Sequence, residues 1–260
     1  MTEQISSAQN PKIKDLISLE TKSRERRARG LFVVEGVREV HRALASGFEA
    51  VELFLHNPSE EIQAGCARYE VSASVYDKIA YREGTEGVVA VMKTRERTLD
   101  SIRLKKNPLV LVLESVEKPG NIGAVLRTAD AAGVDAVLIC DPLTDIFNPN
   151  LIRASLGAIF SVPVVACTGE EAFRWIKAHG MNILTAQLQD SRLYYDTDMK
   201  GGTAIVFGTE DKGLTDFWRE RSDARIRIPM AGLMDSLNVS VSVAVLCFEA
   251  VRQRNTVKQR

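Results

Sequence analysis

The chain has 260 residues, of which 45% are hydrophobic and 26% are charged, with 34 basic and 34 acidic side chains. This composition is typical of a globular protein of one or two domains and excludes disordered and collagen-like chains. The zero net charge excludes a protein that coats nucleic acid by bulk charge, but it leaves room for local basic patches. The first ten residues lack the features of a signal peptide, and no apolar run approaches the roughly 20 residues of a membrane span. We therefore expect a cytoplasmic protein with no membrane partner.

Short apolar runs alternate with helical patterns in residues 1–95. An amphipathic pattern predicts a first helix near Lys12–Ala28, and the alternation that follows predicts an α/β domain. The polar stretch 96–107, which ends before Pro108, predicts a linker. The expected strands are LFVVEG, VELFLH, YEVSA and VVAVMK, with one helix over Val37–Ala45 and another between the second and third strands.

Two basic runs interrupt this otherwise neutral chain. Lys22–Arg29 carries five basic residues against one acid, and Arg252–Arg260 carries four with no acid. Each run alone fits a solvated helix face or a chain end, whereas together they indicate a polyanionic partner. If the first run contacts phosphates, neutralising its arginines should weaken binding and flatten its salt dependence.

After Pro108 the sequence becomes strongly apolar, and LVLVLES predicts a strand buried on both faces, as in a parallel sheet. A helix over Ile122–Ala132, ended by Gly133, and the strand DAVLIC complete a βαβ unit. Residues 108–260 thus predict a second α/β domain with a mainly parallel sheet. The stretch from Asn238 to Val251 alternates apolar and small polar residues, so its period predicts a strand. Further expected strands are VPVVAC, MNILTA, TAIVFG and ARIRIP, with helices at 170–179 and 215–221.

The loop after the first strand of the second domain carries the first candidate site residues. Ligands of parallel sheets bind beyond the carboxyl ends of the strands. This loop, Lys118–Gly123, matches neither the glycine pattern for dinucleotides nor the one for phosphates. Asn121 suits either a helix cap or a site amide. Arg127 either faces the space left by Gly123, four residues earlier, or pairs with Asp130 on the surface.

Two further loops follow strands of the same sheet. In FGTEDKG, Gly208 allows a ligand close to the backbone, and Glu210 can accept hydrogen bonds. The loop from Ile228 to Ser240 offers small, hydroxyl and amide groups, which suit a partly apolar ligand such as an adenine nucleoside. The four cysteines and three histidines show no metal-ligand spacing, so we expect no metal site.

Together, the segments NIGAVLRTADAAG, FGTEDKGL and IPMAGLMDSLNVSVSVAV resemble, in order and spacing, the three motifs of the SpoU (TrmH) family of RNA ribose 2′-O-methyltransferases. The resemblance covers essentially all of residues 109–251. SSAQNPKIK and LFVVEGVREV are similar to the amino-terminal substrate-recognition domain of the family's ribosomal-RNA members, which resembles an RNA-binding ribosomal protein. The segment REGTEGVVAV departs from the pattern, because relatives usually carry a histidine and a glutamine before the glycine.

The resemblance implies a SPOUT methyltransferase domain tied in a trefoil knot, with S-adenosyl-L-methionine as cofactor. It also implies that the stretch after Asn238 is a helix, against the strand that the period predicts. The expected substrate is ribosomal RNA, in particular 23S rRNA, with transfer RNA as the alternative. The expected assembly is a homodimer through the knotted domain, with each site built from both subunits. A non-catalytic RNA-binding or ribosome-assembly factor is the main rival, and a doubly wound nucleotide enzyme is disfavoured by the missing glycine patterns.

The resemblance also assigns roles residue by residue. Arg127 matches the family's usual candidate for removing the hydroxyl proton. A guanidinium, with a pKa above about 12, is a poor base, so we expect it to clamp a phosphate and stabilise the developing alkoxide. Ser236 and Asn238 are expected to orient the ribose. The assigned functional side chains are Asn121, Arg127, Glu210, Ser236 and Asn238, and the assigned cofactor contacts, largely through backbone groups, are Gly208, Ile228 and Leu237.

Overall fold

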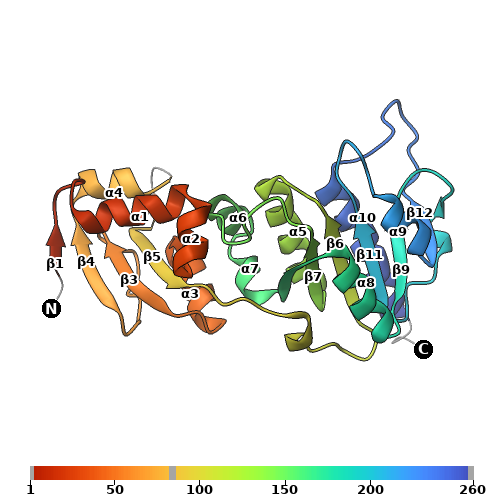
Figure 1. Ribbon diagram of the computed structural model, residues 1–260, viewed down its shortest axis with the longest axis horizontal. Coiled ribbons are helices and arrows are strands. Elements are labelled where there is room, and N and C mark those ends of the chain that lie inside the picture. Colours follow the sequence, from red (N-terminus) through yellow and green to blue (C-terminus); the bar gives the residue numbers. More distant parts are fainter. Residues whose placement is uncertain (1–2, 82–85, 257–260) are drawn as a thin grey trace. The chain divides into compact units, whose positions relative to one another are not determined.

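The structure, a computed structural model, describes residues 3–81 and 86–256 and divides into two compact units (Figure 1). The first unit contains the chain up to Glu96 together with Asp145–Ser161. The second unit contains Arg97–Thr144 and the chain from Val162 onward. Both units combine helices with a central sheet, which confirms the α/β class expected from the sequence.

A five-stranded mixed sheet with the order β1-β4-β3-β5-β2 forms the centre of the first unit. Strands β1, β4 and β3 run parallel, and β5 is antiparallel to both β3 and β2. The strands are β1 (Glu3–Ile5), β2 (Leu31–Glu35), β3 (Ala50–Leu55), β4 (Ala67–Val71) and β5 (Val88–Lys93), and the helices of this part of the chain are α1 (Pro11–Thr21), α2 (Ser23–Arg29), α3 (Val37–Ala45) and α4 (Ala73–Ile79).

The single helix expected near Lys12–Ala28 is in fact two helices, α1 and α2. Lys22 separates them with an extended backbone, at φ −116° and ψ 106°. The buried Arg26 of α2 donates from Nη1 to the carbonyls of Leu19 at 2.7 Å and Glu20 at 2.9 Å. The end of α1 leaves such carbonyls without helical partners, so Arg26 stabilises the break.

The helix expected between β3 and β4 is absent. Residues 57–66, all of which the structure describes, are irregular, and Pro58 and Gly65 both disfavour a helix there. Ile62 is fully buried, and its carbonyl accepts a hydrogen bond from Arg68 Nη1 at 2.9 Å. The helix of this region comes after β4 instead, as α4.

Residues 145–161 fall inside the range expected for the second domain, yet they belong to the first compact unit. They form α6 (Pro149–Ala154) and α7 (Ala158–Ser161), which pack against β2 and α3, respectively. Asp145 Oδ2 accepts a hydrogen bond from Arg26 Nε at 2.7 Å, with both side chains more than nine-tenths buried. This buried ion pair ties the segment to α2.

An aromatic cluster joins the same segment to the core of the first unit. The ring of Phe147 lies 4.7 Å from that of Phe32, and the ring of Phe160 lies 5.1 Å from that of Phe48. All four rings are buried. The apolar contacts of α6 and α7 are therefore made with strands and helices more than 90 residues earlier in the sequence.

The segment that departs from the family pattern, REGTEGVVAV, includes residues 82–85, which lie outside the described residues. Glu86 is described, and its Oε2 accepts a hydrogen bond from Val37 N at 2.7 Å. The carboxylate thus lies at the first turn of α3, where it stabilises backbone N–H groups that have no helical partner.

Glu20 gives the first unit a testable pH dependence. Burial, together with the charge of Glu35, raises the pKa of Glu20 to about 8. Above about pH 4.5 the unfolded chain releases a proton that the folded chain still holds, so the free energy of unfolding should fall as the pH rises to about 8. Glu20→Gln should remove this fall and stabilise the protein at pH 8.5 by up to about 4 kcal/mol. Urea unfolding at pH 5 and pH 8.5 measures the difference.

The control for this measurement is Glu61→Gln, because Glu61 is exposed. The control should follow the wild type at both pH values. If Glu20→Gln lost stability with pH as steeply as the wild type, Glu20 would not be the group responsible.

The second unit is built on a seven-stranded sheet with the order β10-β12-β9-β11-β6-β7-β8, and every neighbouring pair is parallel. All six residues of the central strand β6 are buried, as the sequence predicts. Strand β11 lies between β6 and β9, both of which precede it in the chain. The strands are β6 (Leu109–Glu114), β7 (Ala136–Cys140), β8 (Val164–Cys167), β9 (Asn182–Ala186), β10 (Arg192–Leu193), β11 (Thr203–Phe207) and β12 (Ala224–Arg227), and the α-helices are α5 (Pro119–Ala132), α8 (Gly169–Ala178), α9 (Asp216–Arg221) and α10 (Val239–Thr256).

The stretch 97–107, most of the expected linker, packs on the second unit. It contains a short 3₁₀ turn over Leu99–Ser101, and the side chains of Leu99, Ile102 and Leu104 lie against the apolar core. Where the stretch meets β6, Asp135 Oδ2 accepts a hydrogen bond from Leu109 N at 2.9 Å.

The stretch after Asn238 is the helix α10, so the strand that its period predicts is wrong and the family resemblance is right. Its buried residues Val243, Leu246 and Ala250 recur at helical spacing, on a helix that packs against α5. Asn238 Oδ1 accepts a hydrogen bond from Ser240 N at 3.0 Å, as at a helix start. Packing against α5 overrides the β-branched propensity of this segment.

Within residues 3–81 and 86–256, no helix has the length and apolar character that a membrane crossing requires. Over the same ranges, no group of three or more His, Cys, Asp or Glu side chains is arranged to hold a metal ion. The four cysteines are free.

Candidate functional site

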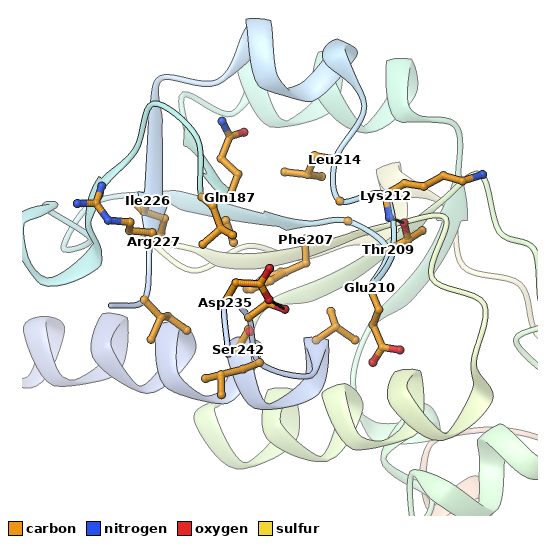
Figure 2. Close-up of a pocket in the computed structure, with 18 of the residues that line it drawn as sticks. Gln187, Phe207, Thr209, Glu210, Lys212, Leu214, Ile226, Arg227, Asp235 and Ser242 are labelled. Atoms are coloured by element: carbon orange, nitrogen blue, oxygen red, sulfur yellow. Dashed lines mark hydrogen bonds between the residues drawn. The ribbon is translucent and has the colours of Figure 1, made fainter. Parts of the chain in front are cut away.

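A cavity of about 490 Å³ opens in the second unit beyond the carboxyl ends of β9, β11 and β12 (Figure 2). Its walls are the ends of these three strands, the loops after them, Arg219 of α9 and the start of α10. This volume lies in the range of small-molecule sites, roughly 300–1,000 Å³. Apolar side chains of the wall include those of Phe207, Leu214, Ile226, Ile228, Leu237, Val239 and Leu246.

The loop after β11 folds back on itself next to the cavity. Thr209 and Gly213 exchange two backbone hydrogen bonds, at 3.0 and 3.2 Å. A Cβ atom on Gly208 would lie 2.2 Å from the carbonyl carbon and oxygen of Gly213, closer than any side chain can approach. Gly213 itself has φ +66°, a conformation that favours glycine. The loop fold therefore requires glycine at 208, and this places bare backbone in the cavity wall.

Glu210 joins the three motif segments. Its Oε1 accepts hydrogen bonds from Asn121 Nδ2 at 3.1 Å and from Asn238 Nδ2 at 2.5 Å, and its Oε2 accepts from Lys118 Nζ at 2.6 Å. Figure 2 shows the Glu210 side chain directed toward α5, which carries Asn121. The bond from Lys118, followed by that from Asn121, lowers the pKa of Glu210 below its ordinary value. Glu210 is thus an ionised anchor that orients two amides, and it is a weak base.

The structure contradicts the capping role considered for Asn121. Helix α5 begins at Pro119, so Asn121 lies inside its first turn. Its side chain instead bonds Glu210 and accepts from Asn238 Nδ2 at 3.3 Å. The amide of Asn121 therefore belongs to the network around Glu210.

Arg127 lies apart from this network. It is exposed on α5, four residues after the buried Gly123. The described residues that line the cavity do not include Arg127.

The loop after β12 supplies the rest of the site predicted from the sequence. Ser236 is exposed, and its Oγ donates to Asp235 Oδ1 at 3.2 Å, separate from the bonds around Glu210. The cavity wall contains Gly208, Glu210, Ile228, Ser236, Leu237 and Asn238, whereas Asn121 reaches the site through Glu210 and Arg127 does not reach it.

The loop after β9 also contributes to the cavity, although the sequence motifs did not predict it. Gln187, which directly follows this strand, lines the cavity, and so does Arg219 of α9. The signal was present in the sequence, because MNILTA is an expected parallel strand and ligands bind beyond the carboxyl ends of such strands.

Comparison with known proteins agrees with this arrangement. Residues 108–248 match the SpoU rRNA methylase family, and residues 10–90 match the MRM3-like substrate binding domain. The chain belongs to the SpoU rRNA methylase family. The resemblance seen in the motifs is thereby confirmed, and the Glu210 network links all three SpoU motif segments.

Similar SpoU-family proteins cover both units of the chain. The 23S rRNA (guanosine(2553)-2′-O)-methyltransferase RlmP of Bacillus subtilis (strain 168) is 32% identical over 248 residues, covering 94% of this chain and 98% of RlmP. The 23S rRNA (guanosine-2′-O-)-methyltransferase RlmB of Vibrio vulnificus (strain CMCP6) is 35% identical, covering 73% of this chain and 79% of RlmB. The crystal structure of an AdoMet-bound rRNA methyltransferase from Sinorhizobium meliloti has a TM-score of 0.89 at 30% identity, covering 96% of this chain and 98% of that one.

Proposed function

We propose that this SpoU-family protein methylates a ribose 2′-hydroxyl of 23S ribosomal RNA, with S-adenosyl-L-methionine as the methyl donor. One observation carries the proposal: Glu210 gathers the three motif segments beside a single cavity at the carboxyl edge of the sheet. RlmP and RlmB, which are similar over most of the chain, are 23S rRNA 2′-O-methyltransferases by name, and the S. meliloti relative binds AdoMet.

The cavity suits this cofactor. Its apolar side chains can flank an adenine ring, and two buried polar atoms of its wall, on Gln187 and Arg219, have no protein partner within the described residues. Gly208, Ile228 and Leu237 are proposed to hold the cofactor, largely through backbone groups. When bound, S-adenosylmethionine supplies an electrophilic methyl group on a sulfonium.

The chain's own residues are proposed to position the RNA for in-line transfer, which needs close approach and exclusion of water. The Glu210 network orients the amides of Asn121 and Asn238, and Asn238 and Ser236, which line the cavity, can orient the ribose. Arg127 clamps the adjacent phosphate by two hydrogen bonds and stabilises the developing alkoxide, while the guanidinium stays protonated.

We also propose a homodimer through the second unit, in which a second copy supplies Arg127 to each site. Two observations support it. Arg127 is absent from the described residues that line its own cavity. Val241 and Phe248, seven residues apart on one face of α10, are 46% and 48% exposed, and Leu237 before the helix is 39% exposed. Exposed apolar patches of this kind are typical of protein interfaces.

Placing glutamates at this face should separate the dimer. The double variant Val241→Glu and Phe248→Glu is expected to be monomeric at micromolar concentration, because burying two carboxylates in an apolar interface is costly. Light scattering measures the mass, with Asn255→Glu, an exposed change on the same helix, as the dimeric control. A monomeric wild type would contradict the proposed assembly.

We propose two further properties of the protein, its knotted fold and its place in the cell. A trefoil knot is consistent with the family resemblance and with the strand order, in which β11 lies between β6 and β9, two strands that precede it in the chain. A ribosomal RNA substrate implies that the protein works in the cytoplasm, where ribosomes are assembled.

The first basic run divides into structural and available arginines. Arg26 is buried and ion-paired to Asp145, so its neutralisation would destabilise the first unit by leaving that carboxylate without its partner. Arg29 is also ion-paired, at the surface. The expectation that all the arginines of this run act on RNA is therefore narrowed to Arg24 and Arg27, which are exposed.

The double variant Arg24→Gln and Arg27→Gln is expected to weaken binding to 23S rRNA fragments. If both side chains bind phosphates, the slope of log K against log salt concentration should fall by about 0.7–0.9 for each phosphate that the variant no longer neutralises. Filter binding between 50 and 300 mM salt measures the slope, and Lys78→Gln, an exposed change on α4, is the control. An unchanged slope would show that Arg24 and Arg27 do not bind phosphates and that this face of α2 is simply solvated.

The decisive experiment incubates the protein with methyl-labelled S-adenosylmethionine and separate samples of 23S rRNA, 16S rRNA and transfer RNA, then maps ribose methylation. Label at a 2′-oxygen of 23S rRNA supports the proposal. Label confined to transfer RNA would contradict 23S rRNA as the substrate and make transfer RNA the substrate. Cofactor binding without methyl transfer to any RNA would indicate a non-catalytic factor.

A further inference from the structure

Two polar atoms in the wall of the cavity lack hydrogen bonds. Gln187 Oε1 and Arg219 Nε are buried, and within residues 3–81 and 86–256 neither has a partner. Both residues line the cavity, and Figure 2 shows the side chains of Gln187 and Leu214 on the same side of the sheet. Buried polar groups are almost always satisfied by protein, water or ligand, so two such atoms in one wall point to a ligand group.

The direction of the Gln187 amide is fixed by a neighbour. Its Nε2 donates to the carbonyl of Gln189 at 2.9 Å. Because a carbonyl can only accept, the nitrogen must face Gln189, which leaves Oε1 as an acceptor. Arg219 Nε can only donate. The two residues therefore leave one acceptor and one donor without a protein partner.

We propose that Gln187 selects the adenine base of the cofactor, with its Oε1 accepting a hydrogen bond from the exocyclic 6-amino group. An adenine edge presents this amino donor beside a ring nitrogen acceptor, the complement of the free groups on Gln187 and Arg219. The inference rests on the proposed placement of S-adenosylmethionine in this cavity.

The charged amino-acid end of the cofactor suits another part of the cavity. Glu210, Asp211 and Lys212 line it with exposed charged side chains, where an ammonium or a carboxylate keeps its water. Gln187 carries no charge and its free oxygen is buried, so it matches the uncharged base.

Calorimetric binding of two ligands to two proteins tests the inference. S-adenosylhomocysteine carries the 6-amino group, and S-inosylhomocysteine carries an oxygen in its place. Wild-type protein should bind the adenosyl compound at least tenfold more tightly, because two acceptors would otherwise face each other at Gln187. Gln187→Leu should lose about tenfold in affinity for the adenosyl compound and little for the inosyl compound, so that the preference largely disappears.

Gln189→Leu is the matched control, because it removes an exposed side chain at the cavity but keeps the backbone carbonyl that binds Gln187. It should keep the wild-type preference, and the melting temperatures of the free proteins should agree. An unchanged preference in Gln187→Leu overturns the inference, and so does an equal loss for both ligands, which would place Gln187 at the amino-acid end.

A third variant separates this inference from the proposed cofactor site. Leu237→Arg should block binding of both ligands if the cavity holds the cofactor. Undiminished binding by Leu237→Arg would overturn the site and the role of Gln187 together, whereas blocked binding with an unchanged preference in Gln187→Leu overturns the role of Gln187 alone.

Discussion

Arg127→Lys is expected to lower kcat for methyl transfer at least about 100-fold while leaving the Kd for S-adenosylmethionine unchanged. Removing one fixed donor to a developing oxyanion typically costs about 10²–10³ in rate. A lysine keeps the charge, but as a point charge it cannot make two parallel hydrogen bonds to a phosphate. Because Arg127 lies outside the described cavity wall, cofactor affinity should not respond.

Single-turnover transfer to 23S rRNA, together with calorimetry of cofactor binding, separates the two effects. Arg174→Lys provides the control, since Arg174 is an exposed arginine on α8 of the same unit. A wild-type rate in Arg127→Lys would remove Arg127 from the proposed mechanism.

Gly208→Ala is expected to weaken S-adenosylmethionine binding at least about 100-fold. The new Cβ would lie 2.2 Å from the carbonyl group of Gly213 and 2.5 Å from Leu214 N, and these are backbone atoms that cannot rotate away. The loop after β11 must therefore move, and with it the cavity wall that it forms. Calorimetry of cofactor binding measures the loss.

Gly232→Ala is a matched control, because Gly232 lies in the loop after β12 and a Cβ there meets nothing within 4 Å. It should bind the cofactor as the wild type does. Equal binding by Gly208→Ala and Gly232→Ala would show that the folded-back loop does not shape the cofactor site.

Mixing the two disabled proteins tests whether the site is shared. If Arg127 acts on the cavity of the other subunit, a hybrid of Arg127→Lys and Gly208→Ala subunits has one complete site. Random pairing then restores about a quarter of wild-type activity, because half of the dimers are hybrids with one of two sites intact. If Arg127 acts within its own subunit, mixing restores nothing.

The sequence could predict most of the second unit because its signals are local. Each parallel strand is a short apolar run, and Gly133 ends α5 in the left-handed conformation expected of a helix end. The candidate site could be predicted in part, since Glu210 and Asn238 follow strands whose carboxyl ends meet at one edge. The hydrogen bond between Glu210 and Asn238 could not be predicted, because it joins residues that only the sheet order brings together.

The predicted elements that differ from the structure share a physical cause, which is contact with residues outside the predicted element or its local pattern. The strand expected after Asn238 becomes a helix because α5 covers its buried face. The helix expected near Lys12–Ala28 breaks where Arg26 bonds the carbonyls at the end of α1. The place of Gln187 after an expected parallel strand could be read from the sequence, but its unpartnered amide oxygen could not, because that is a property of the folded wall.

The route of the chain through residues 145–161 limits how this protein can be divided. The polypeptide passes between its two units at 96–97, again at 144–145 and a third time at 161–162. A single cut therefore cannot release either unit intact, and a fragment starting at Arg97 would carry Phe147 and Phe160 without the rings that cover them.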